Sequence, residues 1–180
     1  NLLAHNDENS FYDKKLKLNF NSREGKAKFL KHICGLSNSN PANNSYLVIG
    51  VEDANNDITG VDFFDDSKIQ NLVNAYLENA PFIIYENIPF PHLSDHKVVG
   101  LVTIRPRNED KLCRLQKNIW KYRGGMIFLR EGSITKPVDN DVKSTNVNAD
   151  VVRSIENHSQ NNIKLTLDGV VDFLESNKDY

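Results

Sequence analysis

The segment that most constrains the fold is a continuous apolar run over Tyr46–Val51, which polar residues border on both sides. A short run without apolar–polar alternation is typical of a strand whose two faces are both covered. The polar, proline-containing residues 37–45 indicate a loop before it, and Asn55–Asp57 indicates a turn after it. Because such a strand needs covering on both faces, the chain has to build a sheet with further elements packed on it.

An amphipathic helix is expected before this strand. Residues Asn21–Glu24 form a capping box, in which an acceptor side chain is followed three residues later by Glu. Behind it, the apolar positions of residues 27–36 lie on one stripe of a helix. The opposite side of that helix carries Lys28, Lys31 and His32.

The remaining apolar segments predict one more helix and several strands. The helix, capped by Asp65–Ser67, is expected to end before Pro81. Further strands are predicted over Phe11–Leu18, Ile58–Val61, Phe82–Ile88, Val98–Ile104, Ile119–Arg123 and Met126–Arg130. Gly124–Gly125, between the last two, predicts a two-residue hairpin. Because the later strands follow one another by hairpins, the fold class is α+β, a mixed β-sheet with helices packed on it.

Charge is distributed unevenly along the chain, although the net charge is only −2. Residues 1–50 carry a net +3, residues 51–100 a net −7, residues 101–137 a net +6 and residues 138–180 a net −4. This pattern is typical of a domain with one basic face, which suits a polyanionic partner. The alternative is that folding mixes these segments in space, so that no basic face forms.

Composition excludes several other classes of protein. No run approaches the roughly 18 consecutive apolar residues of a membrane helix, so no membrane partner is expected. Cys34 and Cys113 lack the spacing of a metal site and are expected to be free, buried thiols of a cytoplasmic protein. The sequence contains neither a glycine-rich phosphate loop nor a nucleophile-elbow motif.

Four motifs, in order, resemble those of the Schlafen/AlbA-like (AlbA_2) family. The first motif has two acids five residues apart, followed by Lys. The second is an Asn-bearing turn before a strand that ends in Gly-Val-acid-Asp. The third is a Pro after the second helix, and the fourth is Arg-x-Gly-Ser. The positions that match are Glu8, Asp13, Lys15, Leu36, Asn38, Val48–Asp53, Gly60, Pro81, Phe128, Arg130, Gly132 and Ser133. The resemblance covers residues 8–137. It departs from the family in lacking glycine before the central strand and in having Asp13 where Glu is usual.

This resemblance implies a nucleic-acid-binding domain, for DNA or RNA, of the kind found in bacterial regulators and defence-type proteins. The domain is expected over residues 8–137, followed by a C-terminal helical extension or linker over 138–180, with helices at Asp150–Asn157 and Leu167–Ser176. Domains of this family commonly precede further regions in bacterial regulators, so the resemblance implies possible C-terminal domains in a longer chain. The absence of an initial Met is consistent with a piece excised from such a chain. The alternative is a regulatory or oligomerisation module, possible as a homodimer, that does not bind nucleic acid.

The predicted hairpin provides candidate binding residues because side chains alternate along its strands. Lys121 and Arg123 share one face, and Trp120 and Tyr122 share the other. Cations bind phosphates and aromatic rings stack on bases, so such a ribbon suits a nucleic-acid strand. The predicted phosphate contacts are Lys14, Lys15, Lys121, Arg123 and Arg130. Alternatively, the aromatic residues face the core and the cations are only solvated.

The resemblance also implies a second candidate function, because some Schlafen relatives are metal-dependent ribonucleases. By this carry-over Glu8, Asp13 and Asp53 would be the catalytic ligands of Mg²⁺ or Mn²⁺, with Glu52 as another candidate for the third position. Lys15 would then steady a phosphate. Alternatively, Asp13 is a surface strand residue and Asp53 begins a turn, in which case no cofactor is expected.

Overall fold

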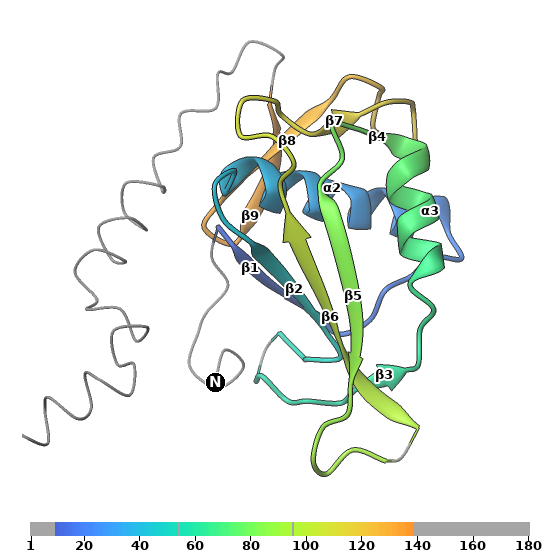
Figure 1. Cartoon of the computed structure of the whole chain (residues 1–180). Coiled ribbons are helices and arrows are strands. Elements are labelled where there is room, and N and C mark those ends of the chain that lie inside the picture. The colour runs from blue at the N-terminus through green and yellow to red at the C-terminus, as the bar shows by residue number, and fades with distance from the viewer. Residues whose placement is uncertain (1–9, 54, 95, 139–180) are drawn as a thin grey trace, which may run out of the picture. The chain divides into compact units, whose positions relative to one another are not determined.

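The computed structural model describes residues 10–53, 55–94 and 96–138. Figure 1 shows the arrangement of its elements. In chain order they are β1 (Tyr12–Lys15), α2 (Arg23–Ser39), β2 (Ser45–Ile49), β3 (Val61–Asp62), α3 (Ser67–Tyr76), β4 (Leu77–Glu78), β5 (Phe82–Ile88), β6 (Lys97–Arg105), β7 (Arg114–Leu115), β8 (Ile127–Glu131) and β9 (Ile134–Val138). Mixed sheets with two helices confirm the α+β class. The C-terminal extension predicted over residues 138–180 lies, beyond Val138, outside the described residues and stays a prediction.

The first sheet has the order β1-β2-β6-β3, with β5 also paired to β6. β1 runs parallel to β2, whereas β6 is antiparallel to β2, β3 and β5. The apolar run forms β2, and its side chains divide between two clusters. Leu47 and Ile49 pack in the main core, while Val48 and Val51 pack in a smaller cluster on the other face. The prediction that both faces of this strand are covered is therefore confirmed.

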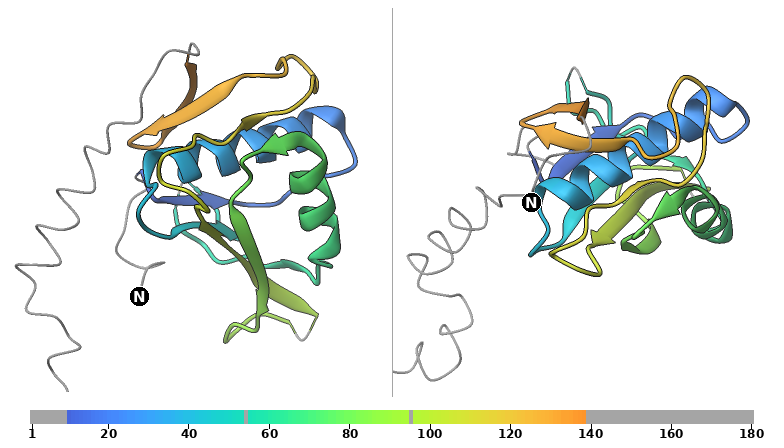
Figure 2. Two further views of the ribbon diagram at one scale, coloured as in Figure 1. Left: turned by 45° about the horizontal axis from the view of Figure 1, so that its top comes forward. Right: turned by 90° about the horizontal axis from the view of Figure 1, so that it is seen from above.

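Helix α2 forms in the predicted segment, but its cap lies one residue later than the Asn21–Glu24 capping box predicts. Its N-cap is Ser22, whose Oγ accepts a hydrogen bond from the backbone N–H of Gly25 at 2.9 Å. Figure 2 shows α2 between the first sheet and the β8–β9 hairpin, so the helix is covered from two sides. Fully buried side chains such as Leu30 and Ile33 each stabilise this packing by about 1.5–3 kcal/mol.

Glycine allows the closest approach between α2 and the hairpin. A Cβ at Gly35 would lie 2.5 Å from Cγ2 of Thr135, which belongs to β9. Such a contact is far shorter than van der Waals separation, so β9 can cross the helix here only over a residue without a side chain.

Helix α3 ends earlier than predicted. It stops at Tyr76, because Leu77 and Glu78 leave the helix to pair with Leu115 and Arg114 of β7. The Arg114 guanidinium donates two hydrogen bonds to the Glu78 carboxylate, each 2.8 Å long. Strand pairing, and not Pro81, therefore sets the end of this helix.

The hairpin predicted at Gly124–Gly125 is wrong. The second sheet has the order β4-β7-β8-β9, and β8 pairs with Arg114 of β7 and not with residues 119–123. Gly125 instead donates its N–H to the Leu115 carbonyl at 2.7 Å, so the glycine pair folds back on β7. The tight hairpin lies one strand later, where Glu131 pairs with Ile134 and Gly132 adopts a φ of +57°. Residues 116–126 are thus a connection between strands.

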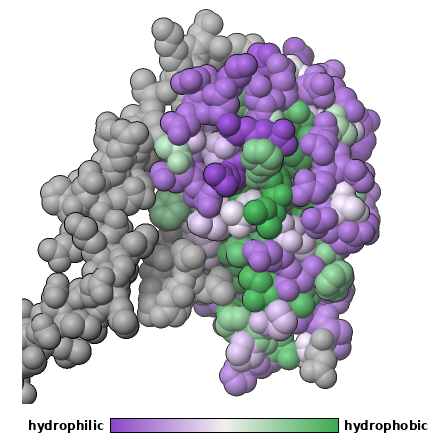
Figure 3. Space-filling model, viewed as in Figure 1, coloured by the Kyte–Doolittle hydropathy of each residue, from purple (hydrophilic) through white to green (hydrophobic). Residues whose placement is uncertain are grey.

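The outer face of the first sheet carries apolar side chains on β5. Phe82 and Ile84 are more than half exposed there. Figure 3 shows apolar side chains gathered over β5 and β6, with hydrophilic residues around them. Within the part of the chain that the structure describes, no helix has the length and apolarity needed to cross a membrane.

Candidate functional site

Asp13 on β1 is the centre of a buried polar cluster. Side chains alternate along β1, so Asp13 and Lys15 lie on the face toward α2, while Tyr12 packs in the cluster on the opposite face. The Asp13 side chain has no exposed surface. A fully buried carboxylate is stable only where cations and hydrogen-bond donors surround it.

Two cationic side chains and a histidine surround this carboxylate. Oδ1 of Asp13 lies 2.8 Å from the ammonium of Lys15 and 3.2 Å from the guanidinium of Arg130. Oδ2 lies 2.9 Å from Nδ1 of His32, which α2 contributes. The cluster therefore joins β1, α2 and β8 through a single carboxylate.

Arg130 is a part of this cluster and not of the surface. Its side chain is 0% exposed. Besides Asp13, its guanidinium contacts the carbonyl of Tyr12 and Oγ1 of Thr135, each at 3.4 Å. The phosphate contact predicted for Arg130 is not supported by this burial, since the ion pair with Asp13 holds the guanidinium inside the protein, and it stays a prediction.

Lys14 also departs from the prediction. It is only 4% exposed, and its ammonium donates a hydrogen bond to Oδ1 of Asn56 on the face of β1 that points away from α2. Lys14 and Lys15 therefore lie on opposite faces of the strand and do not share a surface. The alternation of side chains along a strand, with a period of two residues, is the physical reason.

Lys31 on α2 lies beside the Asp13 cluster with its ammonium half-buried. Burial is the main cause that lowers the pKa of Lys31, and the positive charges of Lys15, Arg130 and Lys28 lower it further. Asp13 opposes them only in part. Among the described residues, the Lys31 side chain makes no ion pair or hydrogen bond. An anion near this ammonium would relieve an unfavourable concentration of positive charge.

The pKa of His32 is lowered as well. Burial lowers its pKa below the ordinary value of 6.5, and Lys15 and Lys31 add to that effect, although the contact with Asp13 raises the pKa. The ring is therefore mostly neutral at pH 7, and the positive charge of the site comes from Lys and Arg side chains.

Trp120 belongs to the connection of residues 116–126 and lies close to the lysines of α2. It is 39% exposed and occupies a tight turn with a φ of +53°, between the bridge partners Ile119 and Tyr122. The ammonium of Lys121 lies 4.3 Å from the centre of the indole ring, and that of Lys28 lies 6.0 Å from it. Cations within about 6 Å of an aromatic face are attracted to it, so the ring gathers two lysines from separate segments.

Together these contacts form one continuous region, which we call the basic surface. Its members are Lys15, Lys28, Lys31, His32, Trp120 and Lys121. Glu24 is the carboxylate that pairs with Lys28, at 2.7 Å. Of the five predicted phosphate contacts, the structure thus brings Lys15 and Lys121 to this surface, on either side of the lysines of α2.

Arg123 is exposed on the same connection, but no described contact joins its side chain to the basic surface. Its backbone N–H lies 3.1 Å from the sulfur of Met126. Tyr122 turns inward and packs edge-on against Phe128 at 5.0 Å. The predicted ribbon, with cations on one face and aromatic rings on the other, therefore does not form.

Sequence reasoning missed Lys28 and Lys31 as site residues. The signal was present, because residues three apart on a helix lie on one side of it and both lysines were placed opposite the apolar stripe. What the sequence lacked was any indication that β1 and the Trp120 turn would flank that side of the helix.

The predicted metal site is not assembled by the described residues. In the described ranges 10–53, 55–94 and 96–138, no group of three or more His, Cys, Asp or Glu side chains could hold a metal ion. The environment of Asp13 does not suit a divalent cation, because Lys15 and Arg130 already compensate its charge and would repel one. Asp53 is exposed in the turn after β2. Glu8 lies outside the described residues, so the ribonuclease interpretation stays a prediction.

Comparisons with known proteins identify the family of this domain. A family model described as Schlafen, AlbA_2 matches residues 8–139, and a second one, described as a domain of unknown function (DUF5929), matches residues 150–180. No curated protein matches the chain. One similar solved structure is the DIP2311 protein from Corynebacterium diphtheriae, with 15% identity and a TM-score of 0.46 over 77% of this chain. The chain spans only 25% of the length of that structure. On the family match over most of its length, the chain belongs to the Schlafen AlbA_2 family.

Proposed function

We propose that this domain binds nucleic acid, DNA or RNA, through the basic surface. The observation that carries the proposal is the half-buried ammonium of Lys31, which faces other cations and has no ion-pair partner among the described residues. Membership of the AlbA_2 family supports the same class of ligand. A protein that retains such a charge at a cost in folding free energy is expected to use it in binding.

The two ends of the basic surface supply different interactions. Near β1, Lys31 and Lys28 are the expected phosphate contacts, and Lys15 adds positive potential while it is bonded to Asp13. At the other end, the exposed indole of Trp120 can stack on a base and Lys121 can reach a phosphate. Phosphates and bases alternate along a strand, so a surface with cations and one aromatic ring suits it.

Within this proposal, Asp13 positions other groups and does not contact the ligand. A carboxylate near phosphate would repel it, but Asp13 is fully buried beneath Lys15 and His32. Its contribution is to fix the direction of those side chains and to hold Arg130 between β1 and β8. A substitution of Asp13 should therefore reduce folding stability before it affects binding.

The test is fluorescence anisotropy with labelled single- and double-stranded DNA and RNA at increasing salt concentration. Neutralisation of two or three phosphates predicts a slope of about −1.5 to −3 in a plot of log K against log salt concentration. Binding that does not weaken as the salt concentration rises would contradict a phosphate-led mechanism.

A role within a bacterial regulator or defence-type protein, a cytoplasmic location and a possible homodimer are finer predictions. They extend this proposal. Size-exclusion chromatography with light scattering measures the oligomeric state directly, and a monomer at all concentrations would remove the dimer.

A further inference from the structure

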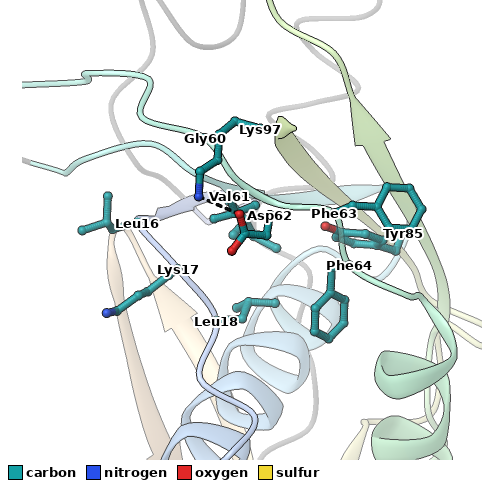
Figure 4. A pocket seen from close by; sticks show the side chains of 11 residues that line it. Leu16, Lys17, Leu18, Gly60, Val61, Asp62, Phe63, Phe64, Tyr85 and Lys97 are labelled. Atoms are coloured by element: carbon teal, nitrogen blue, oxygen red, sulfur yellow. Dashed lines mark hydrogen bonds and ion pairs between the residues drawn. The ribbon is translucent and has the colours of Figure 1, made fainter. Parts of the chain in front are cut away.

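A pocket opens beside the basic surface, between the β1–α2 connection and the segment that contains β3. Its volume is about 370 Å³. Figure 4 shows Leu16 and Lys17 on one side of it and Phe63 and Tyr85 on the other. The lining residues are Leu16, Lys17, Leu18, Ile49, Gly60, Val61, Asp62, Phe63, Phe64, Tyr85 and Lys97. Ligand pockets commonly measure about 300–1,000 Å³, so one small ring system can fit.

Phe63 is the unusual residue of this pocket. Its side chain is 73% exposed, which makes it the most exposed of the large apolar residues in the described part of the chain. Its backbone is nevertheless held in place, because the adjacent Phe64 exchanges two hydrogen bonds with the side chain of Asn87 on β5, of 3.1 and 2.9 Å. Leu16, which is 45% exposed, lines the same pocket, so two exposed apolar side chains meet at one hollow of the surface. Exposed apolar side chains gathered at a pocket are typical of a ligand-binding surface.

Next to Phe63, the wall of the pocket is aromatic. Phe64 packs against Phe20 at 5.2 Å and against Tyr85 at 5.8 Å between ring centres. Burial raises the pKa of Tyr85 to about 12, so this ring stays neutral at physiological pH. The rings are inclined to one another by 55° and 74°, so they line the pocket with both faces and edges. An uncharged aromatic wall of this kind suits an aromatic ligand.

The rim of the pocket is polar and carries both signs of charge. Lys97 and Asp62 form an ion pair of 2.7 Å, and Lys97 keeps the pKa of the Asp62 carboxyl below its ordinary range. Asp62 is therefore an acceptor for N–H groups at neutral pH. Lys17 is exposed and lies two residues after Lys15, so it continues the line of positive charge from the basic surface to the pocket.

From this arrangement we propose that the pocket receives one nucleobase of a single strand whose backbone lies on the basic surface. The base stacks on Phe63, and its exocyclic amine or ring N–H donates a hydrogen bond to Asp62. The phosphate of the same nucleotide contacts Lys17. A base inside a duplex is stacked on its neighbours and cannot enter, so the pocket predicts a preference for single strands. The inference rests on the proposed function and specifies its ligand.

The first experiment compares Phe63→Ala with Phe82→Ala, a matched control on the outer face of β5 whose ring is also more than half exposed. The affinity of Phe63→Ala for single-stranded oligonucleotides should fall roughly tenfold, as expected for one lost base stack, and duplex affinity should not change. Phe82→Ala should bind like the original protein. If both variants bind single strands with equal affinity, the proposal that the pocket receives a base is wrong. If both variants still bind in a salt-dependent way, the proposed function of the basic surface is unaffected.

The second experiment does not depend on polymer binding. Nucleoside 5′-monophosphates and ribose 5-phosphate are titrated into the protein, and the NMR signals of Phe63 and Asp62 are followed. The nucleotides should shift these signals, ribose 5-phosphate should not, and Phe63→Ala should abolish the effect. If ribose 5-phosphate acts as well as the nucleotides, or if neither acts, the pocket does not recognise a base. If nucleotides bind but no oligonucleotide does, the pocket stands and the proposed function of the basic surface fails.

Discussion

Lys31 gives the sharpest test of the basic surface, because its effects on binding and on stability should have opposite signs. In Lys31→Met the aliphatic part of the side chain is kept and the ammonium is removed. The folded protein disfavours that ammonium, since burial and three neighbouring cations lower its pKa. Removal of the charge should therefore leave the free energy of unfolding within about 0.5 kcal/mol, or increase it.

Binding should respond in the other direction. Loss of one charge-assisted contact to phosphate costs about 1.5 kcal/mol, which corresponds to roughly tenfold weaker binding at low salt. The slope of log K against log salt concentration should become shallower by about 0.7 for a single strand or about 0.9 for a duplex. The affinity loss should be similar for every sequence, because phosphates carry no sequence information.

The matched control is Lys26→Met. Lys26 belongs to the same helix and carries the same charge, but it lies about 140° around the helix from Lys31. Anisotropy titrations at several salt concentrations, together with urea unfolding of both variants, complete the experiment. The reasoning is refuted if both variants lose affinity equally, or if Lys31→Met unfolds at a lower urea concentration in proportion to its loss of binding.

Three further predictions concern the buried groups. Asp13→Asn should lower the free energy of unfolding by about 3 kcal/mol in urea titrations, because Arg130 stays buried without its counter-charge; a change below about 1 kcal/mol would contradict the role of this ion pair. His32 should make the fold sensitive to acid: its pKa is lowered on folding, so the stability it contributes is present above pH 6.5 and is lost as the pH falls below that value. His32→Gln should flatten this part of the stability–pH curve, and an unchanged curve would assign the acid sensitivity to other groups. Finally, the sulfurs of Cys34 and Cys113 lie 3.4 Å apart in the core, and burial raises the pKa of Cys34. A thiol reagent should therefore modify these cysteines only after urea unfolds the protein. Rapid modification without urea would show that the core opens.

The parts of the fold that sequence reasoning predicted well are those set by local patterns. The start of α2 to within one residue, the bounds of β5 and the covering of both faces of β2 all follow from patterns of side chains close together in the chain. The hairpin at Gly124–Gly125 failed for the complementary reason. A glycine pair permits a tight turn, but which strands pair is decided by distant partners, and here Leu115 accepts the hydrogen bond of Gly125.

By itself, the amino-acid sequence determined the family, the α+β class and the abundance of cations in the segments that build the site. Only the tertiary structure decided which of these cations lie at the surface and which are buried. Asp13 and Arg130 are 117 residues apart in sequence, yet their ion pair withdraws Arg130 from the surface, whereas Trp120 draws Lys28 and Lys121 together from separate segments. The physical reason is that a charge belongs to the surface or to the core according to the partners that folding places beside it, and a linear sequence does not contain those distances.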